Sequence, residues 1–142
     1  MKTSSFIIPA ERIERRIFYL RSVKVMLSPD LAELYGVAVK ALNQTVRRNL
    51  YRFPEDFMFQ LSREEFDDLK SQIVTSSWGG MRRALPYAFT EQGIAMLSGI
   101  LKSPRAIRVN VEIMRAFVKL RQMLASNAEL LGKLDELERK EE

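Results

Sequence analysis

The chain has 142 residues, of which 46% are hydrophobic and 29% charged, a balance typical of a soluble globular protein that excludes a disordered chain. It contains neither cysteine nor histidine, which excludes disulfides, thiolate or imidazole metal sites and every catalytic arrangement that needs a histidine base. The net charge of +5 is uneven, because residues 1–126 carry 20 basic and 12 acidic side chains whereas residues 127–142 carry 3 and 6, and a basic body of this kind suits a polyanionic partner.

No segment predicts a membrane span. The longest apolar stretch, GIAMLSGIL, is far too short to cross a bilayer, and no hydrophobic leader follows Lys2. We therefore expect a cytoplasmic protein with no membrane partner.

The first half of the chain predicts a hairpin followed by two helices. IFYL and VKVML are β-prone runs separated by Arg21 and Ser22, a spacing that indicates a β-hairpin. Ser28 before Pro29 predicts an N-cap and the first helical residue, and this helix ends at Gly36. A second helix is expected over Val39–Leu50, where the stretch RFPEDF ends it.

The second half predicts further strands and helices. FMFQL is typical of a strand, and SREE is a capping box that opens a helix with Phe66 and Leu69 inward. IVTSS and LPYAF predict two strands joined by the tip WGGMRR. Thr90 is expected to cap the helix EQGIAMLSGIL, and Ser103 with Pro104 to start a long last helix. The order predicts an α+β class: a small winged-helix-like domain over residues 11–110 and a helical arm over 104–142.

The two helices in the middle of the chain fit a helix-turn-helix. Such a pair needs a small residue where the helices touch, a turn residue that accepts positive φ, and apolar residues that hold the crossing. The chain supplies these residues as Ala32, Gly36, Val37, Leu42 and Val46. With that face buried, the polar side chains expected to project outward are Lys40, Asn43, Gln44, Arg47 and Arg48. Asn and Gln pair with adenine edges and Arg with guanine edges or phosphate, so this face has groove-reading chemistry, and the alternative is a helical hairpin with a solvated basic face.

The predicted hairpin tip adds a second basic element. Arg82 and Arg83 follow Gly79 and Gly80 in a turn between two strands. A wing of this kind lays arginines on the DNA backbone or in the minor groove, and the alternative is a pair of solvated arginines at a loop tip.

The same stretches resemble a known family. VMLSPDLAELYGV, RFPEDFMFQL, SQIVTSSWGG and LPYAFTEQGIAML are similar to the N-terminal DNA-binding domain named after a phage open reading frame six, which is related to KilA-N domains. The resemblance extends over roughly residues 13–124 and departs from the family pattern at Ser22, usually glycine, at Ser28, often acidic, and at Ala41, often basic. It implies a phage- or prophage-derived bacterial protein with a DNA-binding domain and a role in regulation or as an antirepressor. We expect a nucleoid-associated transcription regulator that binds double-stranded DNA.

Two alternatives to DNA binding belong to other classes. The acidic side chains that could suggest a magnesium nuclease are Asp56, Glu64, Glu65, Asp67 and Asp68. Four of the five lie in the first turns of a predicted helix, where they favour the helix dipole, and we expect no enzyme, metal or cofactor. The other alternative is an antirepressor-type module that binds a protein, such as a phage repressor.

The last helix carries a heptad pattern that predicts a short coiled coil and a homodimer. From Ile113 the a positions are Ile113, Leu120, Asn127 and Leu134, and the d positions are Ala116, Met123, Leu130 and Leu137. An asparagine at a favours two strands, and in a parallel pair Lys133 would face Glu138 of the partner. Phe117, Leu124 and Leu131 at e widen the stripe, so the first heptads are also compatible with packing on their own domain, which would leave Asn127, Leu130, Leu134 and Leu137 as the dimer seam. The ending LDELERKEE stops within the pattern, and we expect this chain to be a fragment of a longer protein.

Overall fold

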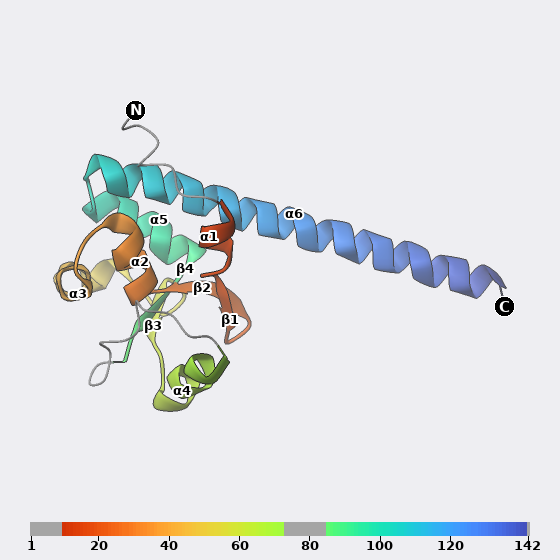
Figure 1. Cartoon of the computed structure of the whole chain (residues 1–142), viewed down its shortest axis with the longest axis horizontal. Helices are drawn as coiled ribbons and strands as arrows, with labels where there is room; N and C mark the ends of the chain where they lie inside the picture. The colour runs from red at the N-terminus through yellow and green to blue at the C-terminus, as the bar shows by residue number, and fades with distance from the viewer. Residues whose placement is uncertain (1–9, 73–84, 142) are drawn as a thin grey trace.

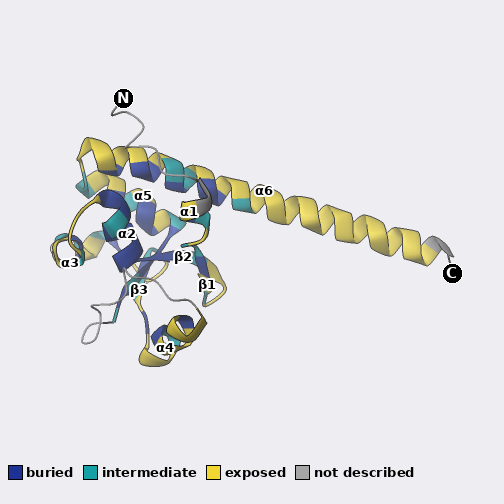
Figure 2. Ribbon diagram, viewed as in Figure 1, coloured by how far each residue is buried: buried dark blue, intermediate teal, exposed yellow. Residues whose placement is uncertain are grey.

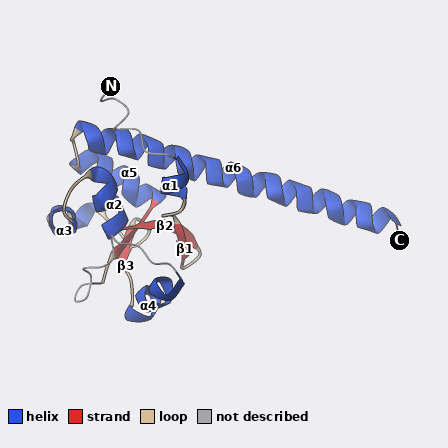
Figure 3. Ribbon diagram, viewed as in Figure 1, coloured by secondary structure: helices blue, strands red, loops and turns tan. Residues whose placement is uncertain are grey.

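The computed structural model describes residues 10–72 and 85–141 (Figure 1). Its elements in chain order are α1 (Ala10–Glu14), β1 (Phe18–Leu20), β2 (Val23–Leu27), α2 (Ser28–Tyr35), α3 (Val39–Arg47), the 3₁₀ helix η2 (Leu50–Arg52), β3 (Met58–Gln60), α4 (Arg63–Gln72), β4 (Tyr87–Thr90), α5 (Glu91–Ile100) and α6 (Pro104–Glu141). Figure 3 shows a small sheet among helices and one long C-terminal helix. The predicted α+β class is confirmed.

The described strands form one antiparallel sheet in the order β1-β2-β4-β3. The predicted β1–β2 hairpin is confirmed, and its two turn residues, Arg21 and Ser22, have φ of 51° and 66°. Positive φ at both central residues is the geometry of a tight two-residue hairpin turn, where glycine or asparagine is the usual choice. Ser22 therefore stands at a position that costs a side chain some backbone strain.

One predicted strand pairing is wrong. Both hydrogen-bonding edges of β4 are occupied, one by β2 and the other by β3. Along Tyr87–Thr90 the partner is therefore not the segment 73–77, as the hairpin hypothesis required. The remainder of that hairpin, including its tip, lies outside the described residues.

The sheet separates two apolar layers. Met26, Phe89 and Met58 lie on the face covered by the helices α1, α2, α5 and α6. Val25, Leu27 and Ala88 alternate with them along the strands and lie on the face covered by α4. α4 packs Phe66 and Leu69 there, as its sequence predicts. The two-residue period of the strands thus gives each face its own core.

The N-caps predicted from the sequence can be compared with those in the structure. Ser62 Oγ accepts the Glu65 N–H at 3.1 Å and Glu65 Oε1 accepts the Ser62 N–H at 2.8 Å, which is the expected capping box. Thr90 and Ser103 cap α5 and α6 as predicted. Ser28 is not an N-cap, because it is already helical and its Oγ accepts the backbone N–H of Tyr87 at 3.1 Å.

α5 lies unusually close to the chain that precedes β3. A Cβ added at Gly93 would stand 2.0 Å from the carbonyl oxygen of Phe57. The same carbonyl accepts the Thr90 N–H at 3.0 Å, so the end of β4 and the start of α5 are both fixed against Phe57.

α6 has two different halves. Its first half packs on α1, α2 and α5 and buries Ile113 and Phe117 completely. From Arg121 to Arg139 every residue is exposed, so this half extends beyond the domain (Figure 2).

Candidate nucleic-acid interface

The turn between α2 and α3 has the geometry of a helix C-cap followed by a sharp change of direction. Gly36 adopts φ 74°, and its N–H donates to Glu33 O at 3.1 Å while the Val37 N–H donates to Ala32 O at 2.9 Å. This pair of bonds is a Schellman motif, which favours glycine at the left-handed position. The turn predicted at Gly36 is confirmed, and Ala32 of α2 is buried.

α2 is held to the helices behind it by polar contacts in the core. The Tyr35 hydroxyl donates to Asn110 Oδ1 of α6, and Asn110 Nδ2 donates to Ser98 Oγ of α5 at 2.7 Å. Burial raises the pKa of the Tyr35 hydroxyl, so it stays a protonated donor. Arg105 Nε also donates to Leu34 O at 3.0 Å, at the C-terminal end of α2. These contacts fix the orientation of α2, and through it that of α3. They join residues far apart in the chain, and sequence reasoning missed them.

α3 separates an inward from an outward face. Its inward positions are half-buried or buried and follow the i, i+3, i+4, i+7 spacing: Val39, Leu42, Asn43 and Val46. Its outward positions, continued by the capping residue after the helix, are exposed: Lys40, Ala41, Gln44, Arg47 and Arg48. The predicted projection of Lys40, Gln44, Arg47 and Arg48 is confirmed.

Asn43 does not belong to this outward face. It is 8% exposed, and its Oδ1 is buried without a hydrogen-bond partner in the described part of the chain. The reason is the helical period, because Asn43 follows Val39 by four residues and precedes Val46 by three. The prediction that Asn43 projects outward is therefore wrong.

Two further details differ from the prediction. Val37 was expected to hold the crossing of the helices, but it is 41% exposed. α3 ends at Arg47 rather than Leu50, because Asn49 Nδ2 donates to Thr45 O at 2.8 Å and the chain continues into η2. η2 then exposes Tyr51, with the Arg52 guanidinium 5.5 Å from the centre of its ring.

The cations of α3 and η2 have no ion-pair partner in the part of the chain that the structure describes. Residues 34–54 contain four basic and no acidic side chains. Within the described ranges, Lys40, Arg47, Arg48 and Arg52 form no ion pair. Seven other cations in those ranges do have carboxylate partners: Arg12, Arg16, Arg21, Arg63, Arg115, Lys119 and Arg121.

The N-terminus of α3 is also open. Its N-cap, Ala38, has no side chain that can accept a backbone N–H, and the first turn holds no acidic residue. The first amides of a helix attract anions when nothing else satisfies them. We define the α3–η2 face as this N-terminus together with Lys40, Gln44, Arg47, Arg48, Tyr51 and Arg52.

The other predicted functional residues lie elsewhere or outside the described residues. Arg82 and Arg83 fall in the segment 73–84, which is not described. The dimerisation candidates Asn127, Leu130, Leu134 and Leu137 are exposed on the second half of α6.

Glu65 and Asp67 of the acidic group around α4 are engaged in local contacts. The Arg21 guanidinium donates to both carboxylate oxygens of Glu65, at 3.0 and 2.9 Å, and this lowers the pKa of Glu65 to about 2. Asp67 Oδ1 lies 3.9 Å from Arg63 Nη1, one turn earlier in α4. Among the described residues no group of three acidic side chains could hold a metal ion, and no described helix is long and apolar enough to span a membrane.

Comparison with known proteins places the chain in one family. The family model described as the ORF6N domain matches residues 15–100, more than half of the chain and the whole of the α2–turn–α3 unit. No curated protein and no solved structure matches the chain significantly. The chain thus belongs to the ORF6N domain family, a phage-related domain.

Proposed function

We propose that this domain is a regulator that binds double-stranded DNA, with α3 lying in the major groove. The observation that carries the proposal is the α3–η2 face, on which four cations stand without ion-pair partners in the described ranges. A phosphate backbone supplies the counter-charge that this face lacks, and the release of counterions drives such binding.

The outward side chains of α3 are of two kinds: some can contact base edges, and others can contact the DNA backbone. Gln44 lies between Lys40 and Arg47 at spacings of four and three residues, so the three side chains follow one line along the helix. Glutamine can bind an adenine edge with two hydrogen bonds, and arginine can do the same with guanine. Ala41 on the same face is small, which permits close approach of the helix to the groove.

η2 would lie beside the groove that α3 enters. Tyr51 is 79% exposed, and Arg52 Nε donates to its hydroxyl at 3.3 Å. A tyrosine hydroxyl and an arginine at the edge of a reading helix are typical phosphate contacts, which fix register and orientation without specifying sequence. We propose Arg82 and Arg83, on their sequence alone, as further backbone contacts, without the strand pairing that a wing hairpin would need.

Binding of labelled duplex DNA measured at several salt concentrations tests the proposal. Selection of bound fragments from genomic DNA would supply the preferred sequence. Four to six phosphate contacts predict that the logarithm of the binding constant falls with the logarithm of salt at a slope of about −4 to −5. A chain that binds no duplex at about 50 mM salt would refute the proposal.

A second candidate function is binding to another regulator, such as a phage repressor. The observation that favours it is an apolar groove of about 510 Å³ on the outer side of α6, lined by Ile107, Val111, Met114 and Val118 with Ser98 of α5 below. Ile107 and Val111 are 51% and 44% exposed there. If this candidate is correct, substitutions in the groove abolish binding to the other regulator while duplex binding is unchanged. Substitutions in α3 then have no effect on binding to that regulator.

A further inference from the structure

One apolar stripe runs along α6, and the domain covers only its first half. The a, d and e positions of the heptad register that starts at Ile113 define this stripe. Its covered members are Ala106, Val109, Asn110, Ile113, Ala116 and Phe117. Its uncovered apolar members, each 49–63% exposed, are Met123, Leu124, Leu130, Leu131, Leu134 and Leu137. Nothing in the described part of the chain covers the second half (Figure 2).

We propose that this uncovered half pairs with the same segment of a second copy of the chain, and that the two helices run antiparallel. The seam extends from Leu120 to Leu137 of each copy, about 26 Å at 1.5 Å per residue. In this register Leu120 faces Leu137 of the second copy, and Met123 faces Leu134. Asn127 then faces Leu130, so each a position lies opposite a d position. This arrangement differs from the parallel pair that the heptad pattern alone suggests.

The position of the domain on α6 is the first reason for the antiparallel direction. Ile113, Ala116 and Phe117 are buried under the domain and occupy the same a, d and e positions as the seam. In a parallel pair both domains would therefore lie at one end, on the inner sides of the two helices, where the partner helix has to pass. In an antiparallel pair the domains lie at opposite ends, and the whole seam is free to form.

The leucines at the e positions are the second reason. In a parallel pair e residues face g residues, so Leu124 would lie against Lys119 and Leu131 against Ser126. In the antiparallel register e residues face e residues, and Leu124 packs against Leu131 of the second copy. The antiparallel pair therefore buries all six uncovered apolar members of the stripe. The one ion pair that a parallel arrangement offers, Lys133 with Glu138, is solvent-exposed and contributes little.

Charge is the third reason. Residues 135–142 contain five acidic and two basic side chains. A parallel pair would place two of these acidic ends side by side. The antiparallel register separates them by about 30 Å along the axis, well beyond the screening length of roughly 8–10 Å at ordinary salt.

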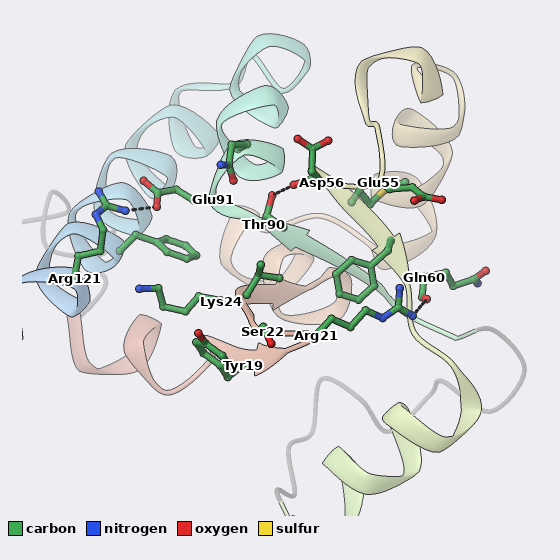
Figure 4. A pocket seen from close by; sticks show the side chains of 15 residues that line it. Tyr19, Arg21, Ser22, Lys24, Glu55, Asp56, Gln60, Thr90, Glu91 and Arg121 are labelled. Atoms are coloured by element: carbon green, nitrogen blue, oxygen red, sulfur yellow. Dashed lines mark hydrogen bonds and ion pairs between the residues drawn. The ribbon is translucent and has the colours of Figure 1, made fainter. Parts of the chain in front are cut away.

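A cavity of about 860 Å³ lies where the stripe emerges from the domain (Figure 4). Phe117 and Arg121 of α6 line it together with Tyr19 and Lys24 of the β1–β2 hairpin. In the antiparallel register residues 136–140 of the second copy pass alongside residues 117–121. Glu55, Asp56 and Glu91 also line the cavity, and Glu91 is paired with Arg121. Lys24 has no ion-pair partner in the described ranges, so its ammonium group is the one that suits the acidic end of the second copy.

The direction of the pair has a consequence for DNA binding, which rests on the proposed function. α3 lies at the end of the molecule opposite to the C-terminus of α6 (Figure 1). An antiparallel pair would thus hold its two α3 helices at opposite ends of a long rod. Such a dimer would bridge two separate DNA sites rather than read one short inverted repeat.

Thiol crosslinking of the full chain tests the direction, and it needs no DNA. Because the chain has no cysteine, each introduced thiol is unique. In the antiparallel register, an equal mixture of Met123→Cys and Leu134→Cys proteins crosslinks at least several-fold better than either variant alone. Two copies of the Met123→Cys protein in an antiparallel pair hold their thiols about 16 Å apart along the axis, too far for a disulfide or a short reagent. Efficient crosslinking of each variant with itself would show the parallel pair and overturn the proposal.

Light scattering of the intact chain provides the companion measurement. We expect the mass of two chains, and Leu130→Lys with Leu134→Lys should reduce it to the mass of one. The matched control changes Gln122 and Glu129 to Lys, because both lie at exposed outer c positions and outside the acidic end, so it should leave the dimer intact. An intact chain that is monomeric at high micromolar concentration would overturn the proposal, whether or not the chain binds DNA.

Discussion

Two surfaces of the domain carry arginines, and they differ in what those arginines contact. Where α1 meets α2, Arg12 and Arg16 bind Glu33 at 2.7 and 3.0 Å, and Arg16 also lies 3.5 Å from the buried Asp30. The Arg16 hydrogen bond is the main reason why the pKa of Glu33 is lowered. On the α3–η2 face, Arg47 and Arg48 have no such neighbour among the described residues. An ion-paired cation stabilises the folded domain, whereas a cation without an ion-pair partner keeps its charge available for a ligand.

The largest expected effect is the loss of DNA affinity when the arginines of the α3–η2 face are removed. Changing both Arg47 and Arg48 to Ala removes two backbone or base contacts. We expect duplex binding to weaken by about 2–4 kcal/mol, roughly 30-fold or more, as measured by fluorescence anisotropy at low salt.

The matched control removes the same charge from paired positions. Arg12 and Arg63 each have a carboxylate partner, and their side chains are 50% and 56% exposed. Changing both to Ala should alter duplex affinity by about three-fold at most, because only the long-range field changes. Equal losses from the two double variants would show that net charge, and not the α3–η2 face, governs binding.

The second prediction concerns the paired surface and the free energy of unfolding. Arg16→Ala leaves Asp30, whose side chain is 1% exposed, without its arginine, and we expect it to lower the free energy of unfolding by about 1–3 kcal/mol. Arg12→Ala removes only an exposed contact and should cost less than about 1 kcal/mol. Urea unfolding measures both changes. An Arg16→Ala protein as stable as the parent would mean that this paired surface contributes nothing to the fold.

The local elements of this fold were predictable from sequence because short-range chemistry determines them. The SREE capping box, the turn at Gly36 and the cap at Thr90 each depend on residues within four positions of one another. The β1–β2 hairpin is equally local. The outward face of α3 followed from the helical period for four of its five predicted members.

What sequence did not reveal depends on contacts between distant segments. The insertion of β4 between β2 and β3 joins parts of the chain about thirty and sixty residues apart, and no local pattern encodes that choice. The same holds for the bond from Tyr35 to Asn110 and for the contact of Gly93 with Phe57. Asn43 was misplaced for another reason: its polarity suggested exposure, although its spacing from Val39 and Val46 already indicated the inward face.

The third prediction compares neighbours within α3. Gln44→Ala should relax preference at one base pair by about 1–2 kcal/mol, roughly ten-fold in competition between duplexes of different sequence. Asn43→Leu should leave base preference unchanged, because that side chain faces the core. It should also keep or slightly raise the stability, since it removes a buried carbonyl oxygen that has no partner in the described chain. If the Asn43→Leu protein had a changed preference for DNA sequence, Asn43 would have to contact DNA after all.

The smallest effect concerns another paired cation, Arg21, and the pH dependence of the stability that its ion pair provides. The Arg21 guanidinium lowers the pKa of Glu65 from 4.5 to about 2. A carboxyl whose pKa is lower in the folded than in the unfolded chain stabilises the fold above its unfolded pKa. That stabilisation is lost as the pH falls from about 4.5 towards 2.

Glu65→Gln isolates this charge, because glutamine can keep the capping-box contact to the Ser62 N–H. The full shift would correspond to roughly 3 kcal/mol. The side chains of Glu65 and Arg21 are 22% and 49% exposed, so solvent screening reduces our expectation to about 1 kcal/mol. The difference in unfolding free energy between the parent and Glu65→Gln should therefore be constant above about pH 5 and shrink towards zero near pH 2. A difference that stays constant down to pH 2 would show that the Arg21–Glu65 pair adds no charge-dependent stability. In that case this arginine would resemble the unpaired ones of the α3–η2 face.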